Sequence, residues 1–168
     1  MKVMVGGTFD PLHDGHKQLL TRSFDLATRE GTVIIGLTTD SFARVKSHPV
    51  RPYEEREKNL KTFIENQGYT TSYRIEPLSD RYGSALDADF DAIVVSEETL
   101  PAATEINRLR NEAGRHKVDI HQITCVLAED RRWISSTRIY RGEIDDHGRL
   151  TGTTMSGGKN NRVNRKRP

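Results

Sequence analysis

Apolar residues along the chain occur in short runs, and these runs alternate with stretches of helical periodicity. The short runs are rich in β-branched residues and predict five strands, at residues 2–5, 32–37, 71–76, 91–95 and 119–127. Apolar residues spaced three or four apart predict helices at residues 14–30, 54–67 and 101–113, and a last short helix beginning in the Ser-Ser-Thr run at residues 135–137. The polar stretches 38–53 and 78–89 are predicted to be loops.

Strands that alternate with helices favour βαβ units, and right-handed crossovers between them give a doubly wound sheet. We therefore expect an α/β protein with a five-stranded parallel sheet of Rossmann-like type. In such folds ligands bind beyond the carboxyl ends of the strands, near the point where the strand order reverses. Polar segments follow four of the predicted strands, at residues 6–17, 38–46, 96–99 and from 135 onward. We expect these four segments to form one site.

Composition limits the class of protein. The chain has 168 residues, of which 34% are hydrophobic and 30% charged, so one domain with a real core is expected. No apolar run approaches the roughly 20 residues of a membrane-spanning helix, and no secretory signal pattern is present. The single cysteine, Cys125, excludes an intrachain disulfide and favours a reducing, cytoplasmic location.

Charge is unevenly distributed, although the net charge is only +2. The last 18 residues hold five of the 26 Lys and Arg and none of the 24 acidic residues, so residues 1–150 carry 21 basic against 24 acidic side chains. We expect one domain at residues 1–150 and a basic, disordered tail at residues 151–168. The tail can attract nucleic acid weakly, whereas the slightly acidic domain argues against nucleic acid as the main partner.

The sequence GGTFDPLHDGHK, at residues 6–17, has the residue types of a phosphate site. Glycines such as Gly7 let backbone amides approach an anion, and the N-terminus of the helix that follows attracts phosphate. We expect Asp14 to cap that helix, and His16 and Thr8 to donate hydrogen bonds. By themselves, two histidines three residues apart also fit a surface pair or a capping contact. Zinc is a weaker interpretation, because no other ligand has a recognisable spacing.

Two motifs resemble those of a known superfamily. The run GTFDPLHDGH, at residues 7–16, resembles the GTFDxxHxGH signature of the nucleotidyltransferases. The run ISSTR, at residues 134–138, resembles their late I-S-[ST]-[ST] motif, which binds triphosphate at a helix N-terminus. Within the superfamily, residues 1–150 most resemble the phosphopantetheine adenylyltransferases of archaeal and eukaryotic type. The features that carry this resemblance are Pro11, DAIVVSEET at residues 91–99 followed by Ile106, Asn107 and Arg110, and ISSTRIYRGEID at residues 134–145.

The resemblance implies a reaction between ATP and 4′-phosphopantetheine in coenzyme A biosynthesis, with 3′-dephospho-coenzyme A and pyrophosphate as products. The substrate phosphate attacks the α-phosphorus directly, so the protein supplies no nucleophile and acts by positioning and charge stabilisation. Mg²⁺ is expected as the cofactor, held mainly by ATP oxygens and water. The resemblance carries no information about oligomeric state.

The same resemblance implies site residues. Those expected to bind ATP are Gly7, Thr8, Phe9, His13, His16, Asn107, Arg110, Ser135, Ser136, Thr137 and Arg138. Among these, His16 is expected to stabilise the transition state at the α-phosphate. Lys46, together with Thr8, is expected to bind the phosphate of phosphopantetheine, although Arg44 and Arg51 lie close in sequence and Lys46 also fits an ordinary loop lysine.

The sequence also supports expectations for three further residues and leaves alternative functions open. We expect Asp10 to position the turn rather than bind metal and Cys125 to be a core thiol, while Trp133 fits either packing or contact with adenine. The alternative enzymes are a cytidylyltransferase, an FAD synthetase and a nicotinamide-nucleotide adenylyltransferase. The run EDRRW at residues 129–133 differs from the R-T-x-G that precedes ISTT in cytidylyltransferases. A nucleotide sensor without activity is disfavoured, because both histidines and the whole ISSTR run are present.

Overall fold

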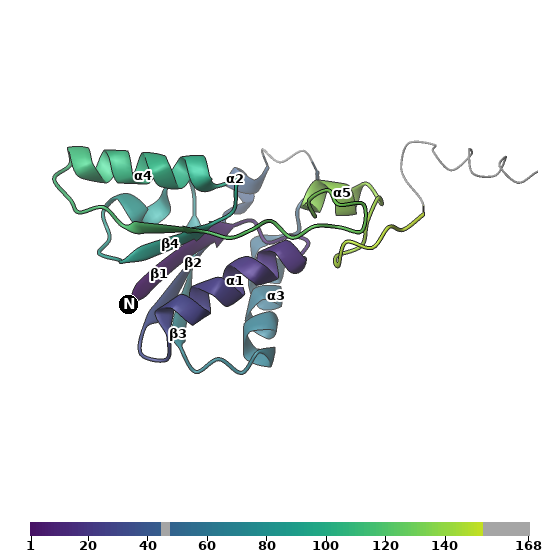
Figure 1. Ribbon diagram of the computed structural model, residues 1–168, viewed down its shortest axis with the longest axis horizontal. Coiled ribbons are helices and arrows are strands. Elements are labelled where there is room, and N and C mark those ends of the chain that lie inside the picture. The colour runs from purple at the N-terminus through teal and green to yellow at the C-terminus, as the bar shows by residue number, and fades with distance from the viewer. Residues whose placement is uncertain (45–47, 153–168) are drawn as a thin grey trace, which may run out of the picture.

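Five parallel strands form one sheet at the centre of the molecule (Figure 1). The computed structural model describes residues 1–44 and 48–152. The elements are β1 (Lys2–Gly7), α1 (Asp14–Ala27), β2 (Thr32–Thr38), α2 (Asp40–Ala43), α3 (Tyr53–Asn66), β3 (Ser72–Leu78), the 3-10 helix η1 (Gly83–Leu86), β4 (Ala92–Val95), α4 (Leu100–Glu112), β5 (Asp119–Gln122) and α5 (Ser136–Tyr140). The strand order is β3-β2-β1-β4-β5, which confirms the predicted doubly wound, Rossmann-like sheet.

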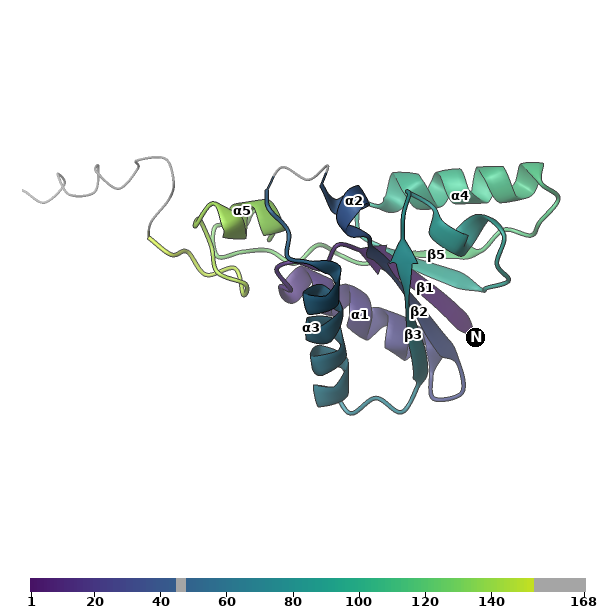
Figure 2. The ribbon, with the colours of Figure 1, turned by 180° about the vertical axis from the view of Figure 1, so that it is seen from behind.

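Helices cover both faces of this sheet, as Figures 1 and 2 show. Because side chains alternate along a strand, Val3 and Val5 face α1 and α3, whereas Met4 faces α4 and η1. The apolar cluster on the face of Val3 and Val5 includes Leu20 of α1 and Leu60 of α3, both fully buried. Each face therefore has its own apolar core, and this explains the nearly continuous apolar runs of the central strands.

The structure differs from the sequence expectations at the ends of several elements and within both predicted loops. The loop predicted at residues 78–89 contains η1. The fifth strand ends at Gln122, because its neighbour β4 ends at Val95 and offers no further backbone to pair with. The first helix ends at Ala27, where Thr28 adopts a positive φ of 63°. The loop predicted at residues 38–53 contains the short helix α2, which Thr39 begins by accepting a hydrogen bond from the Phe42 amide.

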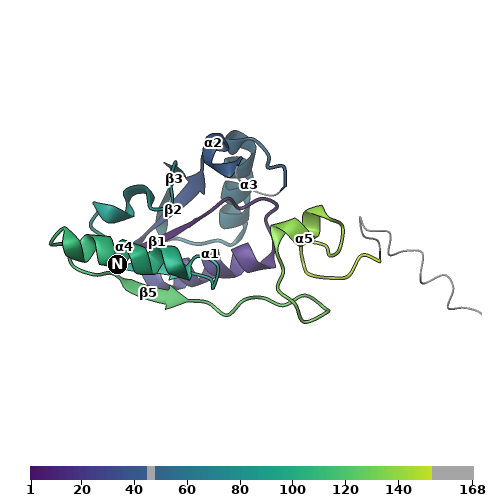
Figure 3. The same cartoon turned by 90° about the horizontal axis from the view of Figure 1, so that it is seen from above.

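The carboxyl ends of the strands point toward a small C-terminal segment, residues 126–150, that contains α5 (Figure 3). This segment has its own apolar cluster of Ala128, Ile134 and Ile144. Its backbone bonds to the start of α1, where the Asp14 amide donates to the Asp146 carbonyl at 3.1 Å. The two motif-bearing parts of the chain therefore meet at the carboxyl edge of the sheet. Within the described residues, none of the helices combines the length and hydropathy needed to cross a membrane.

Candidate active site

His13, not Asp14, caps the helix that follows the first motif. Its backbone is extended, and its Nδ1 accepts hydrogen bonds from the amides of Gly15 and His16 at 3.0 and 3.3 Å. In return, His16 Nδ1 accepts the His13 amide at 3.3 Å, which completes a reciprocal capping box. The expectation that Asp14 is the cap was wrong, because the imidazole reaches the first-turn amides and Asp14 lies already inside the helix.

The two capping bonds also assign the protons of the imidazoles. Because Nδ1 is the acceptor in both rings, the proton of each neutral ring lies on Nε2, which is then a donor. The rings of His13 and His16 stack with centroids 3.7 Å apart. Burial lowers the pKa of His13 to about 4, against a smaller opposing effect of Asp14 and Asp146. His13 is therefore neutral near pH 7 and remains a capping acceptor.

Gly15 is required by the position of the His13 ring. A Cβ atom at residue 15 would lie 2.9 Å from Cε1 of His13 and 3.1 Å from its Nδ1. Any other residue would force the imidazole away from the amides that it caps. The glycine between the two histidines therefore has a steric reason that the sequence alone did not reveal.

The turn between β1 and α1 holds Thr8, Phe9 and Asp10, all of them buried. Phe9 has a positive φ of 52°, and its ring lies 5.2 Å from that of His16. Gly7, the last residue of β1, leaves room for this ring, because a Cβ there would come within 3.3 Å of it. Asp10 accepts the amide and a guanidinium N–H of Arg51 at 2.8 and 2.6 Å, and so holds the turn as expected.

Arg56 is a residue of this site that the sequence analysis missed. Its side chain is fully buried and bonds to the Thr8 carbonyl and the Thr38 hydroxyl beneath the turn. Arg56 occupies the same helix face as Leu60 and Ile64, at spacings of four residues. A charged residue at an apolar position of an amphipathic helix was the available signal.

The second motif begins α5. Ser135 is its N-cap and accepts the Arg138 amide at 3.2 Å, and Ser136 and Thr137 form the partly exposed first turn. The Arg138 side chain points into the C-terminal segment, where it donates to Asp130, to Glu143 at 2.9 Å and to the Trp133 carbonyl at 3.0 Å. The hydrogen bonds from Arg138 are the main reason that the pKa of Asp130 is lowered to about 2. Arg138 thus stabilises the C-terminal segment by bridging residues before and after α5.

Asn107 and Arg110 lie elsewhere. The Asn107 amide pairs with both backbone groups of Val118 at 2.9 Å, just before β5 begins. Arg110 is fully buried over the Phe90 ring and donates to the carbonyls of Ala85, Ala88 and His116. These contacts lie at the amino ends of β4 and β5, at the opposite edge of the sheet from the histidines. The structure does not bring Asn107 or Arg110 to the site, so we leave them out of it.

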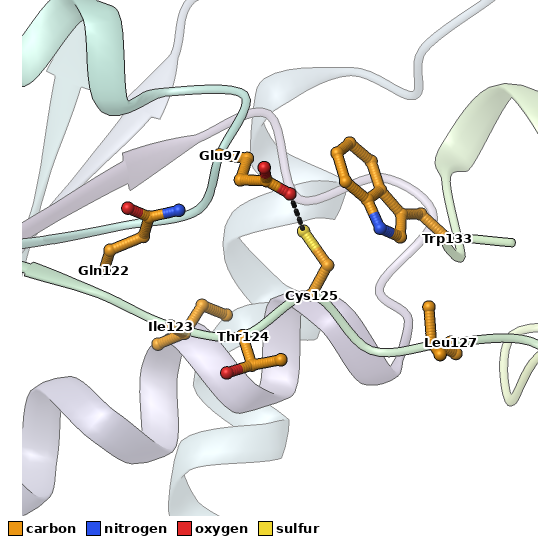
Figure 4. Close-up of a pocket in the computed structure, with 7 residues that line it drawn as sticks. All are labelled: Glu97, Gln122, Ile123, Thr124, Cys125, Leu127 and Trp133. Carbon is orange, nitrogen blue, oxygen red and sulfur yellow. Dashed lines mark hydrogen bonds between the residues drawn. The ribbon is translucent and has the colours of Figure 1, made fainter. Parts of the chain in front are cut away.

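A pocket of about 360 Å³ opens beyond the ends of β4 and β5 (Figure 4). It is lined by Glu97, Gln122, Ile123, Thr124, Cys125, Leu127 and Trp133. Figure 4 shows the Trp133 indole and the Cys125 thiol facing the same space. Cys125 lies past the end of β5 and contacts Glu97, so the expectation of a core thiol was wrong. Burial is the first reason that the pKa of the Cys125 thiol is raised, which argues against a thiolate nucleophile.

A second pocket, of about 380 Å³, lies beside α2. Its lining consists of Asp40, Ala43, Arg44, His48, Pro49, Val50 and Pro52. The ring of His48 lies 5.8 Å from that of Tyr140 in α5, so this pocket borders the segment that carries the second motif. Lys46 lies outside the described residues, as do residues 153–168, which make up most of the predicted tail.

Comparisons with known proteins show the family to which the chain belongs. Residues 4–142 match the family model described as cytidylyltransferase-like. A phosphopantetheine adenylyltransferase of Methanosarcina barkeri (strain Fusaro / DSM 804) is 49% identical over 150 residues, covering 89% of this chain and 92% of that protein. One of Methanopyrus kandleri is 49% identical over 147 residues, with coverages of 86% and 91%. A crystal structure of a protein of unknown function from Archaeoglobus fulgidus superposes with a TM-score of 0.67 at 38% identity, covering 74% of this chain and 99% of that one.

The chain therefore belongs to the cytidylyltransferase-like class of nucleotidyltransferases, which are enzymes. Within that class it belongs to the phosphopantetheine adenylyltransferases, which confirms the resemblance inferred from Pro11 and from residues 91–99 and 134–145.

Proposed function

We propose that this enzyme transfers the adenylyl group of ATP to 4′-phosphopantetheine, in the cytoplasm, as a step of coenzyme A biosynthesis. The products are 3′-dephospho-coenzyme A and pyrophosphate. The observation that carries the proposal is the stacked pair of neutral imidazoles at the N-terminus of α1, both with Nδ1 engaged and Nε2 as donor. The names of the curated relatives identify the acceptor.

The chemistry is a direct displacement. An oxygen of the phosphopantetheine phosphate forms a bond to the α-phosphorus of ATP, and the bond from that phosphorus to the α–β bridging oxygen breaks. Pyrophosphate leaves with the electron pair. His16 donates its Nε2 proton in a hydrogen bond to an α-phosphate oxygen, where negative charge increases in the transition state. His13 Nε2 adds a further donor, and the dipole of α1 adds a fixed positive potential. The first-turn amides of α1 donate to His13 and to the Asp146 carbonyl, so they act through this dipole.

The remaining contacts divide between the two substrates. The pocket beside Trp133 suits adenine, because its lining combines an indole and two aliphatic side chains, Ile123 and Leu127, with polar side chains. Ser135, Ser136 and Thr137 would bind the β- and γ-phosphates beside α5. The pocket at α2 and His48 suits the phosphopantetheine arm, with Lys46 and Thr8 on its phosphate.

Mg²⁺ is proposed to enter with ATP. The described residues bring together no three His, Cys, Asp or Glu side chains that could hold a metal ion, and Asp10 is already engaged by Arg51. The ion would thus bind mainly to phosphate oxygens and water, where it neutralises charge on the leaving pyrophosphate.

A substrate panel tests the proposal. Pyrophosphate release is measured with ATP, CTP or GTP, each combined with 4′-phosphopantetheine, nicotinamide mononucleotide, FMN or phosphocholine. We expect release only from ATP with 4′-phosphopantetheine, together with a product of the mass of dephospho-coenzyme A. Faster release from CTP, or from ATP with another acceptor, would refute the assignment of the substrates.

A further inference from the structure

Arg56 is a fully buried cation that joins three loops under the turn of the first motif. Its Nε donates to the Arg51 carbonyl at 2.7 Å, and its Nη2 donates to Asp40 Oδ1 at 3.0 Å. Its Nη1 donates to the Thr8 carbonyl at 3.3 Å and to Thr38 Oγ1 at 3.1 Å. Every one of its nitrogens is satisfied, as a buried guanidinium requires. None of these contacts reaches a substrate, so Arg56 acts through its neighbours.

The bond from Arg56 to Thr38 has a fixed direction. A guanidinium can only donate, so the Thr38 oxygen must accept. The hydrogen of the Thr38 hydroxyl then points to Thr8 Oγ1, which lies 3.0 Å away. The Thr8 oxygen is thereby an acceptor within the protein. Within the described part of the chain, no acceptor for the hydrogen of the Thr8 hydroxyl is observed.

We propose that Arg56 and Thr38 are positioning residues that orient the Thr8 hydroxyl as a hydrogen-bond donor toward the reacting phosphates. This inference rests on the proposed function, in which Thr8 contacts the phosphate of phosphopantetheine. A threonine hydroxyl can otherwise rotate and either donate or accept. A phosphate oxygen offers only lone pairs, so a hydroxyl already oriented as a donor needs no reorganisation during the reaction.

Substitution of Thr38 tests the inference without disturbing the buried cation directly. Thr38→Val keeps the shape but removes the hydroxyl, whereas Thr38→Ser keeps the hydroxyl. Both are made alone, and Thr38→Val is also combined with Thr8→Val. Thr71→Val is the matched control, because Thr71 is equally buried and donates to the Thr28 carbonyl at 2.7 Å, at the other edge of the sheet. Turnover with both substrates saturating and the melting temperature are measured for all variants.

We expect Thr8→Val to lower turnover roughly tenfold to a hundredfold, as loss of a donor to a charged group does. Thr38→Val should lower it about threefold to tenfold, Thr38→Ser should stay within about twofold of the wild type, and Thr71→Val should leave it unchanged. In the Thr8→Val background, Thr38→Val should cause no further loss, because Thr38 acts only through Thr8.

Three results would overturn the inference. The first is wild-type turnover in Thr38→Val. The second is an equal further loss when Thr38→Val is added to Thr8→Val, which would mean a general structural effect. The third is wild-type turnover in Thr8→Val, which would remove Thr8 from the reaction while leaving the proposed function intact. A wild-type enzyme that releases no pyrophosphate would instead refute the proposed function, and the role of Thr8 with it.

Discussion

His147 Nδ1 lies 3.0 Å from the Asp14 carboxylate, and this contact joins the C-terminal segment to the first turn of α1, next to His13 and His16. The backbone bond from the Asp14 amide to the Asp146 carbonyl runs beside it. Asp14 stands between His13 and His16 in the sequence, and His147 follows α5 in the same segment. The two motif-bearing segments are therefore joined by a pair of side chains, neither of which is among the residues proposed to bind phosphate.

Breaking the contact between His147 and Asp14 should weaken ATP binding more than it lowers the stability of the fold. The two side chains are only half-buried, so His147→Gln should cost less than about 1 kcal/mol of unfolding free energy. The KM for ATP should rise severalfold, because Ser135 and Ser136 lose their alignment with α1. In a double-mutant cycle with Asp14→Asn, the effects on KM should be less than additive. Strict additivity would show that the two residues act separately.

The buried His13 makes stability depend on pH. Its pKa is about 4 in the folded protein and about 6.5 when exposed, so the unfolded chain binds the extra proton between these values. This contribution, roughly 3 kcal/mol, is fully present above pH 6.5 and is lost as the pH falls toward 4. His13→Asn retains a capping acceptor but does not titrate. Urea unfolding at pH 7, 6, 5 and 4.5 should give a shallower fall for this variant, and parallel curves would contradict the burial argument.

Gly15→Ala tests the steric reason for the glycine. Alanine raises helix propensity by about 1 kcal/mol over glycine, which alone would stabilise α1. Its Cβ would lie 2.9 Å from the His13 ring, however, and we expect the ring to leave the cap. The variant should be less stable by about 1 kcal/mol and bind ATP more weakly. Asp25→Ala, at an exposed position of α1, is the control and should be neutral or stabilising; if Gly15→Ala were stabilising too, the explanation would fail.

Substitutions in the second motif should distinguish residues that bind ATP from residues that stabilise the C-terminal segment. Ser136→Ala should raise the KM for ATP roughly tenfold, with no change in melting temperature, because its hydroxyl is proposed to contact phosphate in the ground state. Arg138→Ala should raise the same KM but also lower the melting temperature, because Asp130 and Glu143 then keep only the more exposed Arg132 as a cation. A normal melting temperature in Arg138→Ala, with weak ATP binding, would mean that Arg138 contacts the nucleotide directly.

Much of this architecture could be predicted from the sequence. Periodicity and Gly or Pro positions located the main strands and helices, because the central strands and the helices α1, α3 and α4 each bury apolar side chains. The ends of the elements were less predictable. Strand β5 ends at Gln122 because β4 ends at Val95, and the apolar pattern of one strand does not show where the neighbouring strand ends.

The residues of the candidate site could likewise be predicted only in part. The histidines and the serines could be found as motifs, since their spacing places them at two helix N-termini. The sequence alone could not show whether Arg110 binds phosphate or has a structural role. In the structure it donates hydrogen bonds to carbonyls at the far edge of the sheet. Arg56 was missed because its partners Thr8 and Thr38 lie at the ends of two different strands, which only the folded sheet brings together.

The most direct measurement of the central claim is turnover and ATP affinity for His16→Ala, with His116→Ala as the control at the opposite edge of the sheet. If His16 stabilises the transition state at the α-phosphorus, His16→Ala lowers kcat by roughly 100- to 1000-fold. The Kd for ATP should change much less, because the dipole of α1, His13 and the contacts proposed at α5 remain, and His116→Ala should match the wild type. Near wild-type turnover in His16→Ala, or a loss confined to ATP affinity, would contradict the account.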